Sequence, residues 1–256
     1  MVYPDAGNFE TNRKLWDIYA QEWSVGTDWV QSMAAGSAKG EAMALHLVGD
    51  EWSPRADLME VVEQFILPYI TPSSCVAEIG SGGGRVASCL MGKVASMDCF
   101  DISQQMLARC KEALDGQETA AATATSFTLL KEPKLPKKAA EAFDFVICFD
   151  VLVHVDLHII YRYMQEIRRV LKPGGKAFIS TANVCSEGGW NRFSTQTKYT
   201  VGGFHFLCPQ IIQQLVAKAG LKVVKEGPPG PSKNVYYNRD YLTVLELDQA
   251  EEPTQM

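Results

Sequence analysis

The chain has 256 residues, with 24 Lys and Arg against 30 Asp and Glu, and therefore a formal net charge of −6 at pH 7. A chain of this length can bury a sizeable core within one domain. The acidic balance and the lack of a clustered basic stripe disfavour nucleic acid as a partner, and no apolar run approaches the roughly 20 residues that a bilayer span requires.

Seven cysteines are scattered along the chain without Cys-x-x-Cys spacing, mostly within apolar runs. This pattern predicts small buried thiols and favours neither a disulfide framework nor a metal site. The N-terminal residues are polar and do not resemble a signal peptide. We therefore expect a cytoplasmic protein that holds no metal and contacts no membrane.

Aromatic residues are concentrated in residues 1–55, which show helical patterns ahead of the first strong strand signal. Tyr19 and Trp23 are four residues apart and share one face of a helix. Such a face can lie against a cationic ligand or exclude water. The alternative is that the aromatic residues only anchor the helix to the core, which we favour for Trp16 and Trp52.

The most specific motif is an apolar strand that runs into a glycine-rich turn, Val76-Ala-Glu-Ile-Gly-Ser-Gly-Gly-Gly-Arg85. Glycines at 80, 82 and 84 permit unusual φ angles and leave no Cβ to obstruct a ligand. A dinucleotide-binding fingerprint would need a further glycine where the chain has Arg85. The turn therefore indicates a nucleotide cofactor other than a dinucleotide.

A second strand is predicted over residues 94–100 and ends at Asp101. This acidic residue follows the glycine turn by roughly the 20 residues at which a carboxylate reaches ribose hydroxyls. A helix follows, with Ser103 as its N-cap and Met106 on its apolar face.

Further along, residues 143–150 form an apolar run typical of a central parallel strand covered on both faces. Residues 157–171 have helical periodicity that stops at Lys172-Pro-Gly-Gly175, and a strand is predicted at 177–181. A last helix at about 209–219 precedes two segments, 221–226 and 241–246, that we expect to pair as antiparallel strands.

Four landmarks in order resemble the class I S-adenosylmethionine (SAM)-dependent methyltransferases that act on small molecules: the glycine turn, Phe100-Asp-Ile-Ser-Gln-Gln-Met-Leu107, the strand at 143–150, and Ile167-Arg-Arg-Val-Leu-Lys-Pro-Gly-Gly-Lys176. The resemblance covers about residues 74–247. It implies an α/β fold with a doubly wound, seven-stranded, mostly parallel sheet and helices on both faces. It also implies an N-terminal helical lid (1–55), a SAM-binding domain (56–248) with a substrate loop at about 183–208, and an acidic tail (249–256).

The same resemblance implies SAM as cofactor and S-adenosylhomocysteine as product. Asp101 is expected to accept both ribose hydroxyls, and Glu78 to orient the turn or meet the amino group. Many relatives place an acidic residue after the third strand for the adenine amine; here only Glu132 or backbone groups could serve. The residues implied at the cofactor are Tyr19, Trp23, Glu78, Gly80, Ser81, Gly82, Gly84, Asp101, Ile102, Ser103, Met106 (which ordinary core packing would equally explain) and Phe149.

Two histidines are candidate catalytic bases. His154 follows the fourth strand, and an ordinary pKa near 6.5 suits proton removal at neutral pH; alternatively it caps a helix or satisfies a loop carbonyl. His205 lies in the long segment 183–208, which either lines a pocket or is a surface excursion packed by its own side chains. The residues expected at the substrate are Asp150, His154, Trp190, Arg192, Tyr199 and His205.

Three functions fit these observations. The leading hypothesis is methyl transfer from SAM to an oxygen, nitrogen or carbon atom of a small-molecule acceptor. The second changes the acceptor to a protein side chain or terminus, and the third is a non-catalytic SAM-binding protein. The sequence does not identify the acceptor, because neither the fold nor the cofactor turn determines it.

Overall fold

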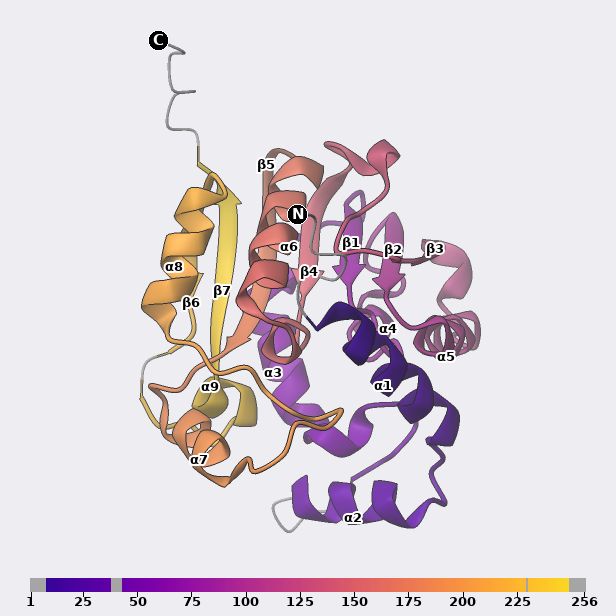
Figure 1. Ribbon diagram of the computed structural model, residues 1–256. Helices are drawn as coiled ribbons and strands as arrows, with labels where there is room; N and C mark the ends of the chain where they lie inside the picture. The colour runs from indigo at the N-terminus through magenta and orange to yellow at the C-terminus, as the bar shows by residue number, and fades with distance from the viewer. Residues whose placement is uncertain (1–7, 38–42, 229, 249–256) are drawn as a thin grey trace.

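A seven-stranded sheet with the order β3-β2-β1-β4-β5-β7-β6 forms the centre of the protein in a computed structural model that describes residues 8–37, 43–228 and 230–248 (Figure 1). Strands β1 to β5 pair in parallel, and β7 runs antiparallel to both β5 and β6. The predicted fold class is thereby confirmed, whereas the predicted acidic tail, 249–256, lies outside the described residues. The strands are β1 (Cys75–Ile79), β2 (Ser96–Asp101), β3 (Ala124–Leu129), β4 (Phe143–Cys148), β5 (Leu171–Ala182), β6 (Leu221–Glu226) and β7 (Asp240–Leu247).

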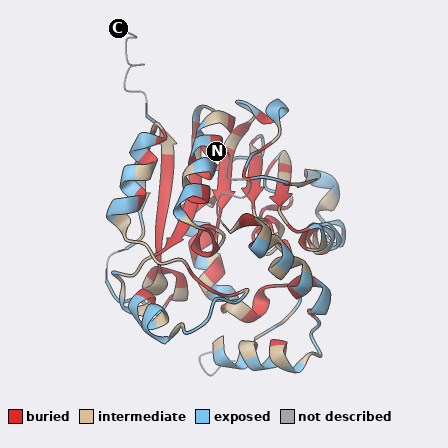
Figure 2. Cartoon of the chain, in the orientation of Figure 1, coloured by how far each residue is buried: buried red, intermediate tan, exposed pale blue. Residues whose placement is uncertain are grey.

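Helices cover both faces of the sheet, because successive residues of each central strand point to opposite sides. In β4, Val146 packs with the helices of one face, and Phe145 and Ile147 pack with those of the other. The central strands β1 and β4 are consequently almost fully buried, whereas the edge strands β3 and β6 are partly exposed (Figure 2). The first face carries α6 (Leu157–Val170) and α8 (Pro209–Lys218), and the second carries α3 (Arg55–Phe65), α4 (Ala87–Leu90), α5 (Gln104–Asp115) and α9 (Val235–Arg239).

Strand β5 begins earlier than its sequence pattern predicts. Leu171 already pairs with Phe143, and a bulge carries the Pro-Gly-Gly sequence before regular pairing resumes at Lys176. A Cβ on Gly175 would lie 2.9 Å from the carbonyl oxygen of Lys172 and 3.1 Å from that of Phe143. The proline and glycines therefore end α6 as expected, but within the strand and not ahead of it.

The N-terminal helices α1 (Phe9–Glu22) and α2 (Asp28–Ser37) lie beside the carboxyl ends of the parallel strands, where α1 packs on α5 and α2 packs on the short helix η1 (Asp50–Trp52). A small core of their own, which includes Tyr19, Trp23 and Val48, joins them to Met106 of α5. No helix of the described ranges is long and apolar enough to cross a membrane. The remaining short helices are η2 (Leu67–Tyr69), η3 (Ala120–Ala122), η4 (Lys137–Ala139) and η5 (Leu152–His154).

Segment 183–208 is not one continuous loop, because it contains α7 (Glu187–Thr195). Ser186 begins this helix by accepting a hydrogen bond from the backbone N–H of Gly189 at 3.1 Å. Gly188 packs closely on α9, since a Cβ at this position would lie 2.6 Å from the carbonyl oxygen of Asn238. An N-cap and a close helix contact thus give the segment a fixed shape.

Candidate functional site

The glycine turn between β1 and α4 brings its backbone to the carboxyl edge of the sheet. Gly80 and Gly82 both have positive φ angles, +73° and +52°. A Cβ on Gly80 would lie 2.3 Å from Cγ2 of Val151, whereas a Cβ on Gly82 would meet no protein atom within 4 Å. Packing therefore requires Gly80, while Gly82 leaves open space where a ligand can approach the chain. Gly84, with φ +86°, instead packs against Cys110 of α5.

Asp101, at the end of β2, is hydrogen-bonded to the backbone of the glycine turn. Its two carboxylate oxygens accept hydrogen bonds from the backbone N–H groups of Gly82 at 2.9 Å and Ser103 at 2.8 Å. Burial raises the pKa of Asp101 to about 6, although the backbone donors oppose the increase. Each oxygen retains a second lone pair, so the carboxylate can accept further hydroxyl donors.

Ser103 has a structural task at this point. Its hydroxyl accepts from the backbone N–H of Met106 at 3.1 Å, which caps α5 as predicted, and donates to Asp17 of α1 at 2.6 Å. The second contact connects the N-terminal helix to the sheet domain. Asp17 was not among the residues expected from the sequence, because nothing in its local pattern distinguishes it from other exposed acids of an amphipathic helix.

Glu78, in β1, has an unsatisfied buried atom. The side chain is 2 % exposed, and its Oε2 has no hydrogen-bond partner among the described residues; the hydroxyl of Ser81 is in the same condition. Burial raises the pKa of Glu78 well above its ordinary value, and the nearby Cys110 and Asp101 add to the effect. A buried acceptor without a partner is costly, so an ammonium donor would fit here.

Two adjoining hollows meet above the turn. The first has an empty volume of about 660 Å³ including its opening, and Asp101, Ile102 and Leu130 are among its lining residues. The second, of about 710 Å³, is lined by aromatic rings and two arginines, and it includes Glu78, Ser81 and Phe149. The residues that line both hollows are Trp16, Gly80, Gly82, Met106, Asp150 and His154.

His154 lies where the hollows join and is 7 % exposed. Its Nδ1 is 2.8 Å from the carbonyl oxygen of Gly203, which can only accept, so Nδ1 carries the proton and Nε2 is left as an acceptor. Burial lowers the pKa of His154 to about 4, against the opposing charge of Asp150. Edge-to-face contacts with Trp16 and Phe204, at centroid distances of 5.2 and 5.3 Å, fix the ring.

Of the predicted aromatic pair, one member lines a hollow and the other does not. Tyr19 lines the second hollow and donates its hydroxyl proton to Glu51, whereas Trp23 donates its Nε1 proton to Glu51 at 2.8 Å and is not a lining residue. Trp16 and Trp52, which we expected only to anchor the helix to the core, both line the second hollow.

The histidine, tyrosine and tryptophan predicted from segment 183–208 lie outside both hollows. Nε2 of His205 is 2.9 Å from the side-chain amide of Asn8, and the hydroxyl of Tyr199 donates to the carbonyl of His154. These two residues tie the segment to the start of α1. Trp190 is 57 % exposed on α7 and packs on Phe193.

The carboxyl end of β3 brings Leu130, and not Glu132, to the first hollow. Leu130 is buried, and its backbone N–H donates to the carbonyl of Asp101 at 2.7 Å. Glu132 is exposed. Apolar side chains and backbone groups are therefore what this strand offers to an adenine ring.

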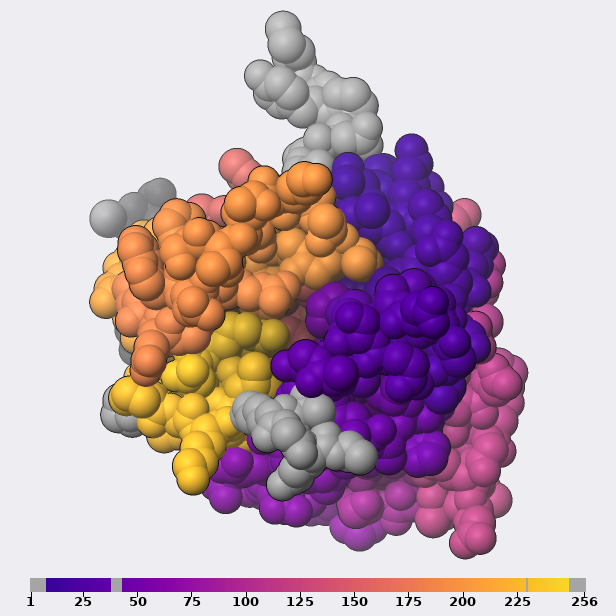
Figure 3. Space-filling model, turned by 90° about the horizontal axis from the view of Figure 1, so that it is seen from below, coloured from indigo at the N-terminus to yellow at the C-terminus, as the bar shows by residue number. Residues whose placement is uncertain are grey.

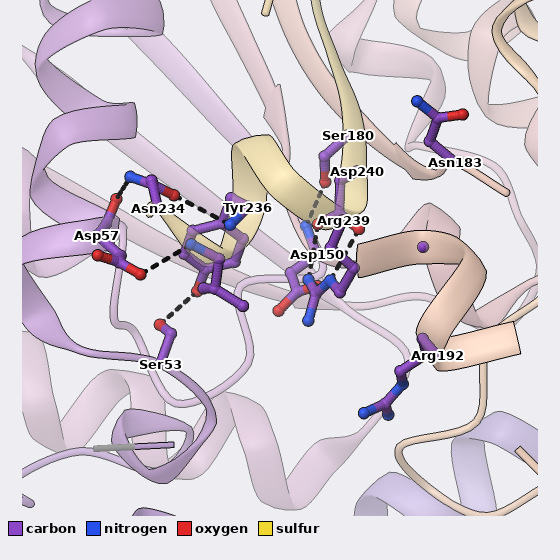
Figure 4. A network of polar contacts seen from close by, with 12 residues as sticks. Ser53, Asp57, Asp150, Ser180, Asn183, Arg192, Asn234, Tyr236, Arg239 and Asp240 are labelled. Carbon is purple, nitrogen blue, oxygen red and sulfur yellow. Dashed lines mark hydrogen bonds and ion pairs between the residues drawn. The ribbon is translucent and has the colours of Figure 1, made fainter. Parts of the chain in front are cut away.

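A polar network in the second hollow was not expected from the sequence (Figure 4). Arg239 donates to Asp150 at 2.8 Å and to Asp240 at 2.6 Å. Burial raises the pKa of Asp240 to about 6, although Arg239 opposes the increase. Asp150 lies in the left-handed region with φ +57°, so this ion pair and the bond from its N–H to Ser180 at 2.8 Å hold a strained residue in place.

Arg85 forms a second buried pair beside the same hollow. Its Nε is 3.1 Å from Oδ1 of Asp50, and one terminal nitrogen donates to the hydroxyl of Ser53 at 3.1 Å. That hydroxyl is 2.7 Å from the hydroxyl of Tyr236. Arg85, at the position where a dinucleotide fingerprint would have glycine, therefore fastens residues 50–53 over the turn.

Known methyltransferases are similar to this chain. Residues 77–179 match the family model described as a methyltransferase domain. A ubiquinone biosynthesis O-methyltransferase of Coxiella burnetii is 23 % identical over 192 residues, which are 70 % of this chain and 79 % of that protein.

Solved structures share the fold. Magnesium protoporphyrin IX methyltransferase from Synechocystis, crystallised with S-adenosylhomocysteine, superposes with a TM-score of 0.61 at 16 % identity and covers 93 % of this chain and 95 % of its own. The CcbJ methyltransferase from Streptomyces caelestis superposes with a TM-score of 0.57 at 16 % identity, covering 77 % and 99 %.

Proposed function

We propose that the protein, as a SAM-dependent methyltransferase, transfers a methyl group to a small-molecule acceptor held in the second hollow. The observation that carries the proposal is that the two hollows share one boundary. The hollow with the ribose-binding type of carboxylate, Asp101, meets the aromatic hollow at Asp150 and His154. A donor with its adenosine part in the first hollow and its ammonium group at Glu78 in the second would face an acceptor held in the rest of the second hollow.

The residues present fit the cofactor. We assign Asp101 to the two ribose hydroxyls, Glu78 with its unsatisfied Oε2 to the ammonium group, and Gly82 to close backbone approach. Ile102 and Leu130 supply apolar walls for adenine. SAM supplies a methyl group on a sulfonium, which is already a reactive electrophile, so the protein mainly has to align the acceptor and keep the site dry.

We assign His154 as the base that accepts the proton of the acceptor hydroxyl. Its low pKa keeps Nε2 unprotonated at neutral pH, and the bond from Nδ1 to Gly203 fixes the tautomer. Nε2 can then accept the proton of an acceptor hydroxyl as the new bond forms. His205 is excluded from this role in our proposal, because Asn8 occupies its Nε2 and the ring lies outside the hollows.

A small acceptor is favoured over a protein acceptor. A protein side chain needs an open groove, whereas the bulky rings of Trp16 of α1 and Trp52 of η1 form part of the wall of the second hollow. Because the similar Coxiella protein is named an O-methyltransferase, oxygen is the first acceptor atom to test. We further propose a reducing, cytoplasmic location, supported by seven free cysteines.

Calorimetric titration with SAM and, separately, S-adenosylhomocysteine tests the cofactor site. We expect micromolar binding of both to the wild-type protein and to the Asp115→Ala control, whose exposed carboxylate lies at the far end of α5. Asp101→Ala should bind neither. Folded wild-type protein that binds neither ligand would refute the function; if both bind, labelled SAM can be used to screen phenolic acceptors.

A further inference from the structure

A third hollow adjoins the aromatic hollow. It is bounded by α2, α7 and α9, has an empty volume of about 1180 Å³ including its opening, and shares Trp52 and Arg239 with the second hollow. In Figure 3 the molecular surface is recessed between the orange segment that contains α7 and the indigo N-terminal helices. A molecule that enters there would pass Trp52 on its way to His154.

Arg192 of α7 lines this entrance and differs from the other two arginines of the region. Arg85 is paired with Asp50, and Arg239 is paired with Asp150 and Asp240. Within the described residues, no carboxylate lies within ion-pair distance of the Arg192 guanidinium. Its one hydrogen bond there, at 2.5 Å, goes to the carbonyl of Gly202.

Packing holds this cation in position. The guanidinium of Arg192 lies 4.6 Å from the ring centroid of Phe204, and that of Arg239 lies at the same distance from the same ring. Burial, and next the charge of Arg239, lower the pKa of Arg192, while the charges of Asp150 and Asp240 oppose the decrease. A half-buried guanidinium with donors to spare and no carboxylate in direct contact among the described residues can bind an anion.

The lining residues of the hollows indicate the shape and charge of the rest of the ligand. Trp52, Phe149 and Tyr236 line the second hollow, which therefore suits a flat apolar ligand. Arg239 has two carboxylate partners, Asp150 and Asp240, which offset part of the charge of Arg192 at longer range. The remaining positive potential at the entrance therefore matches a monoanion better than a dianion. A carboxylate also accepts the paired N–H donors of a guanidinium side by side.

We propose that the acceptor is an aromatic carboxylate whose carboxylate group binds Arg192 at the entrance while its ring extends past Trp52 toward His154. The inference rests on the proposed function and names the substrate class of the same site. Arg192 is in this view a specificity residue that does not touch the transferred methyl group.

The test uses the full chain saturated with S-adenosylhomocysteine and ligand-observed NMR titration of 3-phenylpropionate, its neutral analogue 3-phenylpropanamide, and phenyl phosphate. We expect the carboxylate to bind about 10-fold or more tightly than the amide, as one charge-assisted contact supplies, and more tightly than the phosphate. Arg192→Gln should abolish the preference, Arg192→Lys should retain part of it, and Arg162→Gln, an exposed arginine of α6, should leave it unchanged.

The outcomes separate the two proposals. Equal binding of acid and amide, binding of neither, or a preference that survives in Arg192→Gln would overturn the substrate class while S-adenosylhomocysteine binding upholds the methyltransferase. Tighter binding of phenyl phosphate would replace carboxylate by phosphate as the anion and overturn the inference as stated. Loss of the preference in both Arg192→Gln and Arg192→Lys would assign the residue to loop structure, through its bond to Gly202.

Discussion

Nδ1 of His154 lies 2.8 Å from the carbonyl oxygen of Gly203, so the loop after α7 determines which nitrogen of the imidazole faces the site. The two residues are 49 positions apart in the chain. The contact explains both the structural and the catalytic interpretation of His154: one nitrogen satisfies a loop carbonyl, and the other remains free to act on a ligand.

The buried His154 should make folding sensitive to mild acid. Its pKa is about 4 in the folded protein against an ordinary 6.5, so the unfolded chain binds the proton more readily between these values. The contribution is fully present above pH 6.5 and declines as the pH falls toward 4. From pH 7.5 to 5.0 it should cost roughly 2 kcal/mol of the free energy of unfolding.

Urea denaturation of wild type and His154→Asn at both pH values measures this contribution. The Asn amide can still donate to Gly203 but does not titrate. Asp101 and Asp240, each with a pKa raised to about 6, are present in both proteins and cancel in the comparison. An unchanged difference between the two proteins at the two pH values would show that His154 is not protonated on unfolding.

The raised pKa of Asp101 predicts that ribose binding weakens in acid. The carboxylate predominates above about pH 6 and the neutral acid below it, and a protonated carboxyl has fewer lone pairs for ribose hydroxyls. We expect affinity for 5′-methylthioadenosine to fall about 10-fold between pH 7.5 and 5.0. This ligand keeps the ribose and lacks the ammonium group, so Glu78 does not contribute.

Calorimetry with Asp101→Asn provides the control for that experiment. The amide does not titrate, so its binding should be weaker than that of wild type at pH 7.5 and nearly independent of pH. A wild-type affinity that stays constant from pH 7.5 to 5.0 would contradict the assignment of Asp101 to the ribose.

Gly80 and Gly82 should respond differently to alanine. Both have positive φ angles, which costs alanine about 1 kcal/mol. Gly80→Ala also forces a Cβ against Val151 and should lose a further 1 to 3 kcal/mol, roughly, of unfolding free energy. Gly82→Ala should fold nearly normally and bind S-adenosylhomocysteine at least about 10-fold more weakly, because its methyl group enters the hollows. Thermal unfolding and calorimetry test both variants. If the cofactor did not use the space at Gly82, Gly82→Ala would bind S-adenosylhomocysteine with wild-type affinity.

Local sequence patterns located most strands and the glycine turn, and the family resemblance implied the seven-stranded sheet. The strand, the glycine turn and Asp101 are linked by short spacings, and parallel pairing of β1 with β2 places Asp101 beside the turn. The arginine network could not be predicted in this way. Arg239 and Asp150 are 89 positions apart, and neither has a local pattern that indicates a buried partner.

The aromatic residues of α1 also show that a local pattern does not identify a partner distant in the sequence. Four-residue spacing correctly places Tyr19 and Trp23 on one face, but it does not say whether that face meets the hollow or a neighbouring element. Glu51, about 30 positions further on, decides the matter by accepting from both side chains. Similarly, α7 was not predicted because two adjacent glycines lower its helix propensity.

Glu51 should therefore control the stability of the N-terminal helix without contributing to the sheet. It is fully buried and accepts from Tyr19, from Trp23 at 2.8 Å, and from the backbone N–H of Gly49 at 3.1 Å. Glu51→Ala leaves these buried donors without an acceptor, at a cost of roughly 2 to 4 kcal/mol. That cost should appear as local opening of α1, because the strands pack on other residues.

Hydrogen exchange followed by mass spectrometry can locate the effect. In Glu51→Ala we expect amides of residues 9–22 to exchange at least about 10-fold faster while those of β1 and β4 keep their protection. The KM for SAM should rise, since Trp16 of the same helix lines both hollows. Glu22→Ala removes an exposed carboxylate from the same helix and should change neither quantity. Uniform loss of protection across the sheet would instead mean that α1 and the sheet unfold as one unit, and that Glu51 stabilises the whole protein.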